Sequence, residues 1–111
     1  MNRYIVIYHG SIKAEEQMKD ATPEDMKSGM EAWMTWAKKC GDGLVDLGSP
    51  LGGGMKVSDS GHSPSERNVV GYSILQAEDM DGALALLKGH PHLGWAEGCE
   101  IEVHECLPLP G

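Results

Sequence analysis

The sequence lacks any long hydrophobic run. None of its 111 residues belongs to an apolar stretch approaching the ~20 residues that a membrane span requires. The opening MNRYIVIYHG holds too short an apolar core for a signal peptide, and it has no small-residue cleavage site. We therefore expect a cytoplasmic protein that does not bind a membrane.

Basic residues are also scarce. The chain has 9 Lys and Arg against 17 Asp and Glu, which gives a formal net charge of −8. Such a charge opposes phosphate backbones and anionic lipid surfaces, because both are negative themselves. We predict no nucleic-acid partner.

Cysteine is too sparse to form a disulfide framework. The chain has three, Cys40, Cys99 and Cys106, and an odd number suggests a reducing compartment. Cys99 and Cys106 fall in one expected strand, where their separation exceeds disulfide reach. We interpret all three as small buried or edge thiols.

Several motifs of known chemistry are missing. The run Gly52-Gly53-Gly54 lacks the Gly-Lys-Ser/Thr ending of a phosphate-binding loop, so it indicates a turn or bulge. His62, His90, His92 and Cys99 are zinc-type ligands, but the chain has no Cys-x-x-Cys and no helical histidine pair four apart. No Gly-x-Ser-x-Gly elbow of a hydrolase occurs. We predict no metal and no cofactor.

What the chain does contain is a repeated order of strand, helix and strand. Apolar patterning predicts strands at residues 3–9, 44–47, 69–77 and 100–107, with a strand extension at 55–58. Residues 10–21 show no clear period and are expected to form a loop. The length suits one domain over residues 1–111.

The first expected helix begins at Pro23, with Thr22 as its cap and Asp25 close to a capping box, and it ends at Gly41. We interpret its apolar stripe as flexible core filling rather than as an adaptable binding face. The stripe consists of Met26, Met30, Trp33, Met34 and Ala37.

The second expected helix covers residues 80–87. Asp79 can cap its start, Gly89 can take the left-handed conformation that ends it, and Pro91 prevents it from resuming. Its predicted apolar stripe consists of Met80, Ala83, Leu84 and Leu87.

This element order predicts an α+β fold of the ferredoxin-like split βαβ-βαβ type. In it, a four-stranded antiparallel sheet carries both helices on one face. The strand at residues 3–9 has apolar residues at both its odd and its even positions. The face of the sheet without helices should therefore also carry apolar side chains. A partner sheet is the simplest cover, and we predict a homodimer built as a dimeric α+β barrel.

The segments RYIVIYHG, SPLGG, VVGYSILQAEDMDGALALLKGHPHL and IEVHE resemble the YCII-related (DGPF) family over nearly the whole chain. The resemblance implies the dimeric α+β barrel and, in some members, a suspected His/Asp active site. Two departures bear on that pair. Asp59-Ser60-Gly61-His62 replaces the DGPF tetrapeptide, and Glu24-Asp25-Met26 stands where other branches carry a histidine.

The predicted topology gathers polar residues at one pole of the sheet, on loops held by a rigid scaffold. The residues expected there are His9, Asp59, His62, Glu66, His90, His92 and Cys99. We interpret His92 as the general acid/base, with His9 as a second candidate and Asp59 orienting the histidine. The candidates for ligand binding are Tyr8, His62, Glu66, Tyr72 and His90.

Each candidate has a structural alternative. His9 could be a rim histidine, His62 a solvated loop residue, and His90 a cation near a helix C-terminus. Asp59 before Ser-Gly is typical of a turn. In the last strand one face carries Glu100, Glu102, His104 and Cys106, and the other carries Ile101 and Val103. The second face is expected to pack on the core. The first is expected either to face solvent or to line the cavity of a dimer.

Two functions remain open. The first is a cofactor-free enzyme of isomerase or lyase type, with a histidine acting on a small, apolar substrate at the pole. The alternative is a non-catalytic dimer that binds a small ligand or a partner protein. A monooxygenase of the same barrel architecture rests on fold analogy alone.

Overall fold

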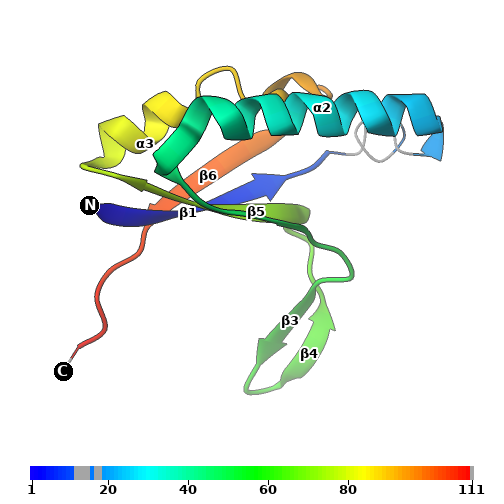
Figure 1. Ribbon diagram of the computed structural model, residues 1–111. Coiled ribbons are helices and arrows are strands. Elements are labelled where there is room, and N and C mark those ends of the chain that lie inside the picture. The colour runs from blue at the N-terminus through cyan, green and yellow to red at the C-terminus, as the bar shows by residue number, and fades with distance from the viewer. Residues whose placement is uncertain (12–15, 17–18, 111) are drawn as a thin grey trace.

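A computed structural model describes residues 1–11, 16 and 19–110 of the chain. Half of the loop expected over residues 10–21 lies outside the described residues, and in the described half Glu16 and Lys19 are helical, contrary to that prediction. Figure 1 shows two layers, in which a four-stranded sheet carries helices α2 (Pro23–Cys40) and α3 (Met80–Leu87) on the same face.

The sheet has the order β2-β5-β1-β6, and every neighbouring pair is antiparallel. Its strands are β1 (Asn2–His9), β2 (Leu44–Pro50), β5 (Val69–Ala77) and β6 (Glu100–Glu105), and two short 3-10 turns, η1 (Gly41–Gly43) and η2 (Pro91–Gly94), follow the helices. The arrangement is α+β and compatible with a ferredoxin-like fold, as the element order predicts.

The predicted caps are confirmed. Thr22 Oγ1 accepts the amide of Asp25 at 3.1 Å, and Asp25 Oδ2 accepts the amide of Thr22 at 3.0 Å, which completes a capping box. Asp79 Oδ1 accepts the amide of Gly82 at 2.8 Å at the start of α3. Gly89, with φ 73°, takes the left-handed conformation expected after that helix.

The predicted buried stripe of α2 is wrong in its methionines. Met26, Met30 and Met34 are 57%, 60% and 46% exposed, whereas Trp36 and Cys40 are buried against the sheet. Both faces of this helix carry apolar residues, and the face with the large indoles packs inward because it buries more area.

In α3 the buried residues are Ala83 and Leu87, while Met80 and Leu84 are exposed. The predicted stripe of this helix is therefore wrong in half of its members. Leu86 packs against the core instead, so the inner face of α3 is rotated from the predicted one.

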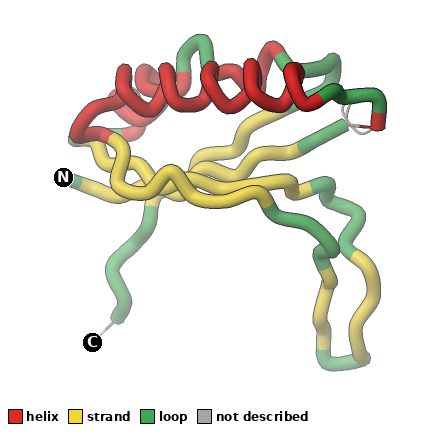
Figure 2. The backbone as a smooth tube through the Cα atoms, turned by 45° about the vertical axis from the view of Figure 1, so that its right-hand side comes forward, coloured by secondary structure: helices red, strands yellow, loops and turns green. Residues whose placement is uncertain are grey.

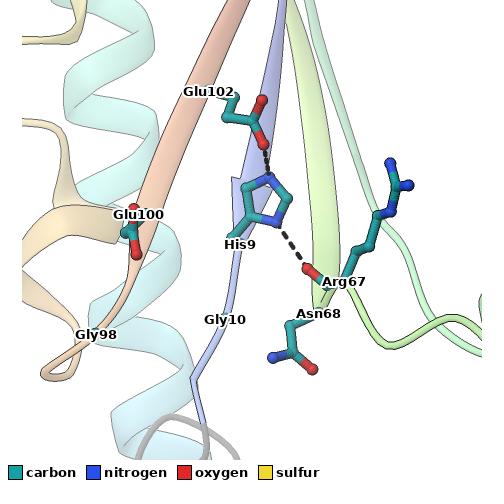
Figure 3. Close-up of a pocket in the computed structure, with 7 residues that line it drawn as sticks. All are labelled: His9, Gly10, Arg67, Asn68, Gly98, Glu100 and Glu102. Atoms are coloured by element: carbon teal, nitrogen blue, oxygen red, sulfur yellow. Dashed lines mark hydrogen bonds and ion pairs between the residues drawn. The ribbon is translucent and has the colours of Figure 1, made fainter.

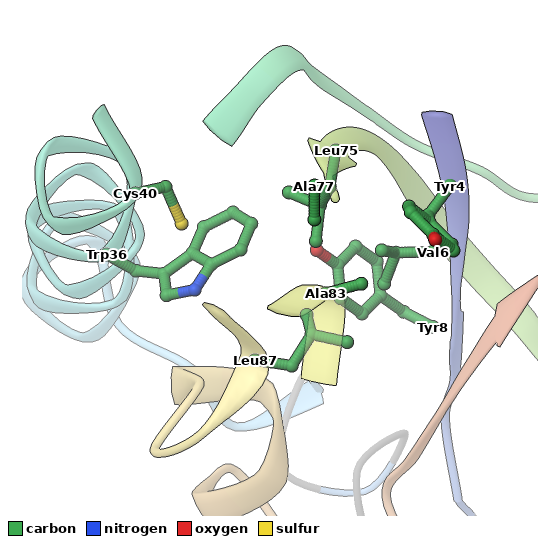
Figure 4. Close-up of a cluster of buried hydrophobic side chains, with 9 residues drawn as sticks. All are labelled: Tyr4, Val6, Tyr8, Trp36, Cys40, Leu75, Ala77, Ala83 and Leu87. Atoms are coloured by element: carbon green, nitrogen blue, oxygen red, sulfur yellow. The ribbon is translucent and has the colours of Figure 1, made fainter. Parts of the chain in front are cut away.

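The core lies between the helices and one face of the sheet (Figure 4). Residues of β1 alternate across the sheet, so Tyr4, Val6 and Tyr8 point toward the helices. Trp36 covers them from α2, and its indole Nε1 donates to the carbonyl of Leu86 at 2.9 Å. The full cluster is Tyr4, Val6, Tyr8, Trp36, Cys40, Leu75, Ala77, Ala83 and Leu87.

The opposite face of the sheet, called the open face below, carries no helix (Figures 1 and 2). The register pairs Ile5 with Ile74 and Ile7 with Tyr72 on this face, and all four are half-buried. Tyr8 pairs with Gly71 and points to the helix side. Tyr8 and Tyr72, two of the candidates for ligand binding, therefore lie on opposite faces of the sheet and do not share one site.

Residues 55–58 form a strand, but not an extension of β2. Strands β3 (Met55–Ser58) and β4 (Gly61–Pro64) pair with each other as a separate hairpin. Figures 1 and 2 show it projecting from the sheet on the side away from the helices. The last strand, β6, ends at Glu105, two residues before the predicted end.

Strand β2 is longer than predicted and irregular. Its register against β5 shifts between Leu44 and Asp46 and again between Asp46 and Ser49. At the second shift Gly48 has φ 84°, and a Cβ there would lie 1.7 Å from the carbonyl oxygen of Tyr72. Only glycine fits this bulge.

Cys40 and Cys99 are buried, Cys106 is exposed, and all three are free thiols. The thiols at 40 and 99 therefore match the interpretation of small buried residues. Of the helices in the described part of the chain, none combines the length and apolar character that a membrane crossing demands.

Candidate functional site

An open hollow of about 270 Å³ lies where β1 ends and β6 begins (Figure 3). Strand β1 contributes His9, β6 contributes Glu100 and Glu102, and the segment before β5 contributes Arg67 and Asn68. The complete lining is His9, Gly10, Arg67, Asn68, Gly98, Glu100 and Glu102. Every side chain in this lining is polar or charged.

His9 is held at both ring nitrogens. Its Nδ1 lies 2.8 Å from the backbone carbonyl of Arg67, and its Nε2 lies 2.6 Å from Glu102 Oε1 (Figure 3). A carbonyl only accepts, so Nδ1 carries a hydrogen, and Nε2 faces the carboxylate of Glu102. The two contacts fix the orientation of the ring.

The contact between His9 and Glu102 is short but is not an aligned hydrogen bond. His9 Nε2 is buried and has no hydrogen-bond partner in good geometry among the described residues, although the carboxylate oxygen is its near neighbour. The Glu102 side chain itself is 54% exposed. Glu102 thus shields a buried nitrogen from the hollow.

Glu102 also binds a second histidine. Its Oε2 lies 2.9 Å from Nε2 of His104, two residues along β6 on the same face. The hydrogen bond from His104, followed by the close contact with His9, holds the pKa of Glu102 below its ordinary value. One carboxylate therefore serves two imidazoles and remains ionised.

A second polar network lies beneath the helices, and each hydrogen in it can be assigned. Ser73 Oγ donates to the carbonyl of Leu47 at 2.6 Å, so Tyr8 must donate to Ser73 Oγ at 2.8 Å. The Tyr8 oxygen then accepts from Nε2 of His90 at 3.1 Å, and Nδ1 of His90 accepts the amide of His92 at 2.9 Å. Every member of this chain, called the buried relay below, is satisfied.

The buried relay is neutral. Desolvation, followed by the charge of His92, lowers the pKa of His90 to about 4, and desolvation raises the pKa of Tyr8 to about 12. The rings of Trp33 and Trp36 pack edge-on to His90 with centroids 4.5 and 4.3 Å away. A neutral imidazole with both nitrogens bonded inside an aromatic cage is a structural group.

His92, the predicted acid/base, is also buried, at 3% exposure. Its Nε2 donates to the backbone carbonyl of His9 at 2.8 Å. His92 therefore ties η2 to the end of β1 and positions the backbone of His9.

The structure brings together only part of the predicted pole. His9, His90 and His92 do meet at one end of the sheet. Asp59 lies in the turn of the β3–β4 hairpin and His62 in β4, both exposed, and neither lines the hollow. Their predicted placement at the pole is wrong because residues 55–64 form a projecting hairpin and not a loop over the sheet.

Glu66 is exposed in the segment between β4 and β5 and does not line the hollow either. The sequence did not indicate that Arg67 and Asn68 line the hollow, or that Glu102 is the partner of His9. The alternation of the last strand placed Glu102 on a polar face, but only the β1–β6 register shows that this face also carries His9.

No metal site emerges from the described residues. They include no group of three or more His, Cys, Asp or Glu side chains suited to holding a metal ion. The chemistry that the described site offers is proton transfer and ion pairing.

No model of a known protein family matches the chain, and no curated protein matches it. The resemblance to the YCII-related family therefore remains a prediction.

Proposed function

We propose that the protein is a cofactor-free enzyme that moves protons on a small polar substrate, in isomerase or lyase chemistry, with His9 as the general acid/base. The observation that carries this proposal is the doubly held His9 at the wall of a polar hollow. Both of its nitrogens are fixed, so the ring is pre-oriented.

Glu102 gives this site a way to open. Nε2 of His9 is buried under the carboxylate, so a substrate reaches it only if Glu102 moves aside. Glu102 retains its ion pair with His104 when Oε1 leaves His9. With its hydrogen held at Nδ1, His9 then accepts a substrate proton at Nε2 and returns it to another atom of the substrate.

His92 has a positioning role in this proposal. It holds the His9 backbone through a 2.8 Å hydrogen bond but does not reach the hollow. The polar lining favours a polar substrate over the apolar one expected from the sequence.

The proposal includes a homodimer. The apolar strip of Ile5, Ile7, Tyr72 and Ile74 lies on the open face, and no helix of the described chain covers it. A second sheet facing this strip would form the dimeric α+β barrel that the YCII-related resemblance implies, and would close the hollow from above.

Deuterium exchange tests the acid/base role. A panel of small carbonyl compounds with acidic C–H groups is incubated with the protein in D₂O, and wash-in is followed by proton NMR. We expect one or more compounds to exchange, and His9→Gln to slow that exchange by about 10²–10⁴-fold. Lys27→Gln, at an exposed position of α2 that does not line the hollow, is the control substitution. Equal exchange with the parent and His9→Gln would refute the role of His9.

A non-catalytic binding dimer is the second candidate. The observation that favours it is the exposed row of Met26, Met30 and Met34 on α2, because methionine-rich surfaces adapt to partners. It predicts ligand-induced NMR shifts without any His9-dependent exchange.

A further inference from the structure

The β3–β4 hairpin has no cover within the described chain. All eight residues of its two strands are exposed, and neither strand pairs with the four-stranded sheet. At its base the amide of Leu51 donates to the carbonyl of Val70 at 2.9 Å, and the amide of Ser65 donates to the carbonyl of Gly54 at 2.9 Å. A lone two-stranded hairpin is at best marginally stable in water.

The hairpin is nevertheless amphipathic. Its register pairs Met55 with Pro64 and Val57 with His62, and because side chains alternate these four share one face. Lys56 and Ser63 form a pair on the other face. Val57 is 77% exposed and Met55 53%, so an apolar face with a single histidine is left bare.

The open face offers a surface of matching character. Its centre is apolar through Ile5, Ile7 and Ile74, and its β6 side is acidic through Glu100 and Glu102. Within the described part of the chain, the Glu100 carboxylate has no hydrogen bond or ion pair. This unpaired carboxylate lies in the hollow beside His9.

We propose that the hairpin of each copy lies across the open face of a second copy, so that the partner's His62 pairs with Glu100 at the hollow. Apolar side chains meet apolar side chains, since Met55 and Val57 would pack against Ile7, the end of the strip beside Glu102 and the hollow, while the facing sheet covers the rest. The charges also match, because the hairpin strands carry Lys56 and no acidic residue while the receiving edge is acidic.

This inference rests on the proposed homodimer and adds a residue to its site. In a two-fold dimer the same surface serves both copies, so each hairpin closes the other's hollow. The figures place the hairpin on the side of the sheet that carries the open face, which is where a facing copy would meet it (Figures 1 and 2).

Sedimentation equilibrium of the full chain tests the contact. Val57→Glu places a charge on the apolar face of the hairpin, and we expect the dimer dissociation constant to rise about 10–100-fold, the equivalent of losing one buried aliphatic side chain. Met30→Glu introduces the same charge at an equally bare site on α2 and should leave association unchanged. A parent that is monomeric throughout, or a Val57→Glu variant that associates like the parent, would overturn the inference.

A charge exchange tests the specific pair. His62→Glu should weaken the dimer, and adding Glu100→Lys should restore it to within about threefold of the parent. Failure of the second change to rescue the first would disprove the pairing. Neither residue lies in the core, so circular dichroism should confirm that every variant is folded.

The two proposals fail separately. If association depends on Val57 and on the exchanged pair while no compound undergoes His9-dependent exchange, the hairpin contact stands and the enzymatic role falls. If exchange depends on His9 but Val57→Glu associates like the parent, the enzymatic role stands and the hairpin contact falls.

Discussion

Tyr8 and His9 are neighbours in β1, yet they belong to two networks with opposite physical character. Tyr8 points under the helices into the buried relay, where donors and acceptors match one for one. His9 points to the open face, where a single carboxylate faces two imidazoles.

The difference shows what each network can do. In the buried relay a change of protonation would leave a donor or acceptor unpaired in the core, so burial keeps His90 neutral. On the open face Glu102 can release His9 at little cost while it keeps His104, since its side chain is 54% exposed. The first arrangement specifies structure, and the second is the one on which the proposed acid/base role depends.

Acidification should affect the buried relay most strongly. The pKa of His90 is about 4 in the folded protein against an ordinary 6.5, so below pH 6.5 the unfolded chain binds a proton that the native state does not. Stability present at neutral pH is therefore lost as the pH falls from 6.5 toward 4, by up to about 3 kcal/mol at about 1.4 kcal/mol per pKa unit. Urea unfolding across this window measures the loss.

His90→Gln is the reference variant, because its amide can still donate to Tyr8 but does not titrate. Its free energy of unfolding should vary less with pH than that of the parent. Parallel pH curves for the two proteins would contradict the assignment of the loss to His90.

Removing one hydroxyl from the buried relay should have the next largest effect. Tyr8→Phe deprives Ser73 and His90 of their shared partner, and we expect a loss of about 1–3 kcal/mol in the free energy of unfolding. Tyr72→Phe on the open face is the matched control and should cost under about 0.5 kcal/mol. Equal losses would show that the two faces of the sheet do not differ as described.

The smallest expected effect concerns Glu102. The hydrogen bond from His104 is the main cause of its lowered pKa, so His104→Ala should raise that pKa toward the ordinary value. Carbon-13 NMR titration of the side-chain carboxyl measures the change, and Lys27→Ala on α2 serves as the control. An unchanged midpoint in His104→Ala would assign the shift to His9 instead.

The sequence predicts the frame of this molecule better than its surfaces. Local rules suffice for caps, so Thr22, Asp25 and Asp79 act as their patterns indicate. Choosing the buried face of a helix requires knowing what lies beneath it. Met30 and Trp36 both satisfy an apolar pattern, and only packing against the sheet decides between them.

The candidate site was harder to predict for the same reason. His9, His90 and His92 are equally plausible as isolated residues, but the structure makes two of them structural through bonds to Tyr8 and to a backbone carbonyl. The partner of His9 comes from β6, far away in the chain, and no local pattern reveals it. The hairpin was missed because the segment around Gly54 and Ser60 carries no strong strand propensity.

Gly48 joins several of these features at one point. The bulge that it permits lies directly after Leu47, whose carbonyl accepts the last hydrogen bond of the buried relay. The same strand then runs out to Pro50 and toward the hairpin. A single methyl group added at Gly48 would collide with the neighbouring strand β5. The absence of a side chain at this position therefore fixes the Leu47 carbonyl at the end of the buried relay. It also sets the direction in which the chain leaves the sheet toward the hairpin.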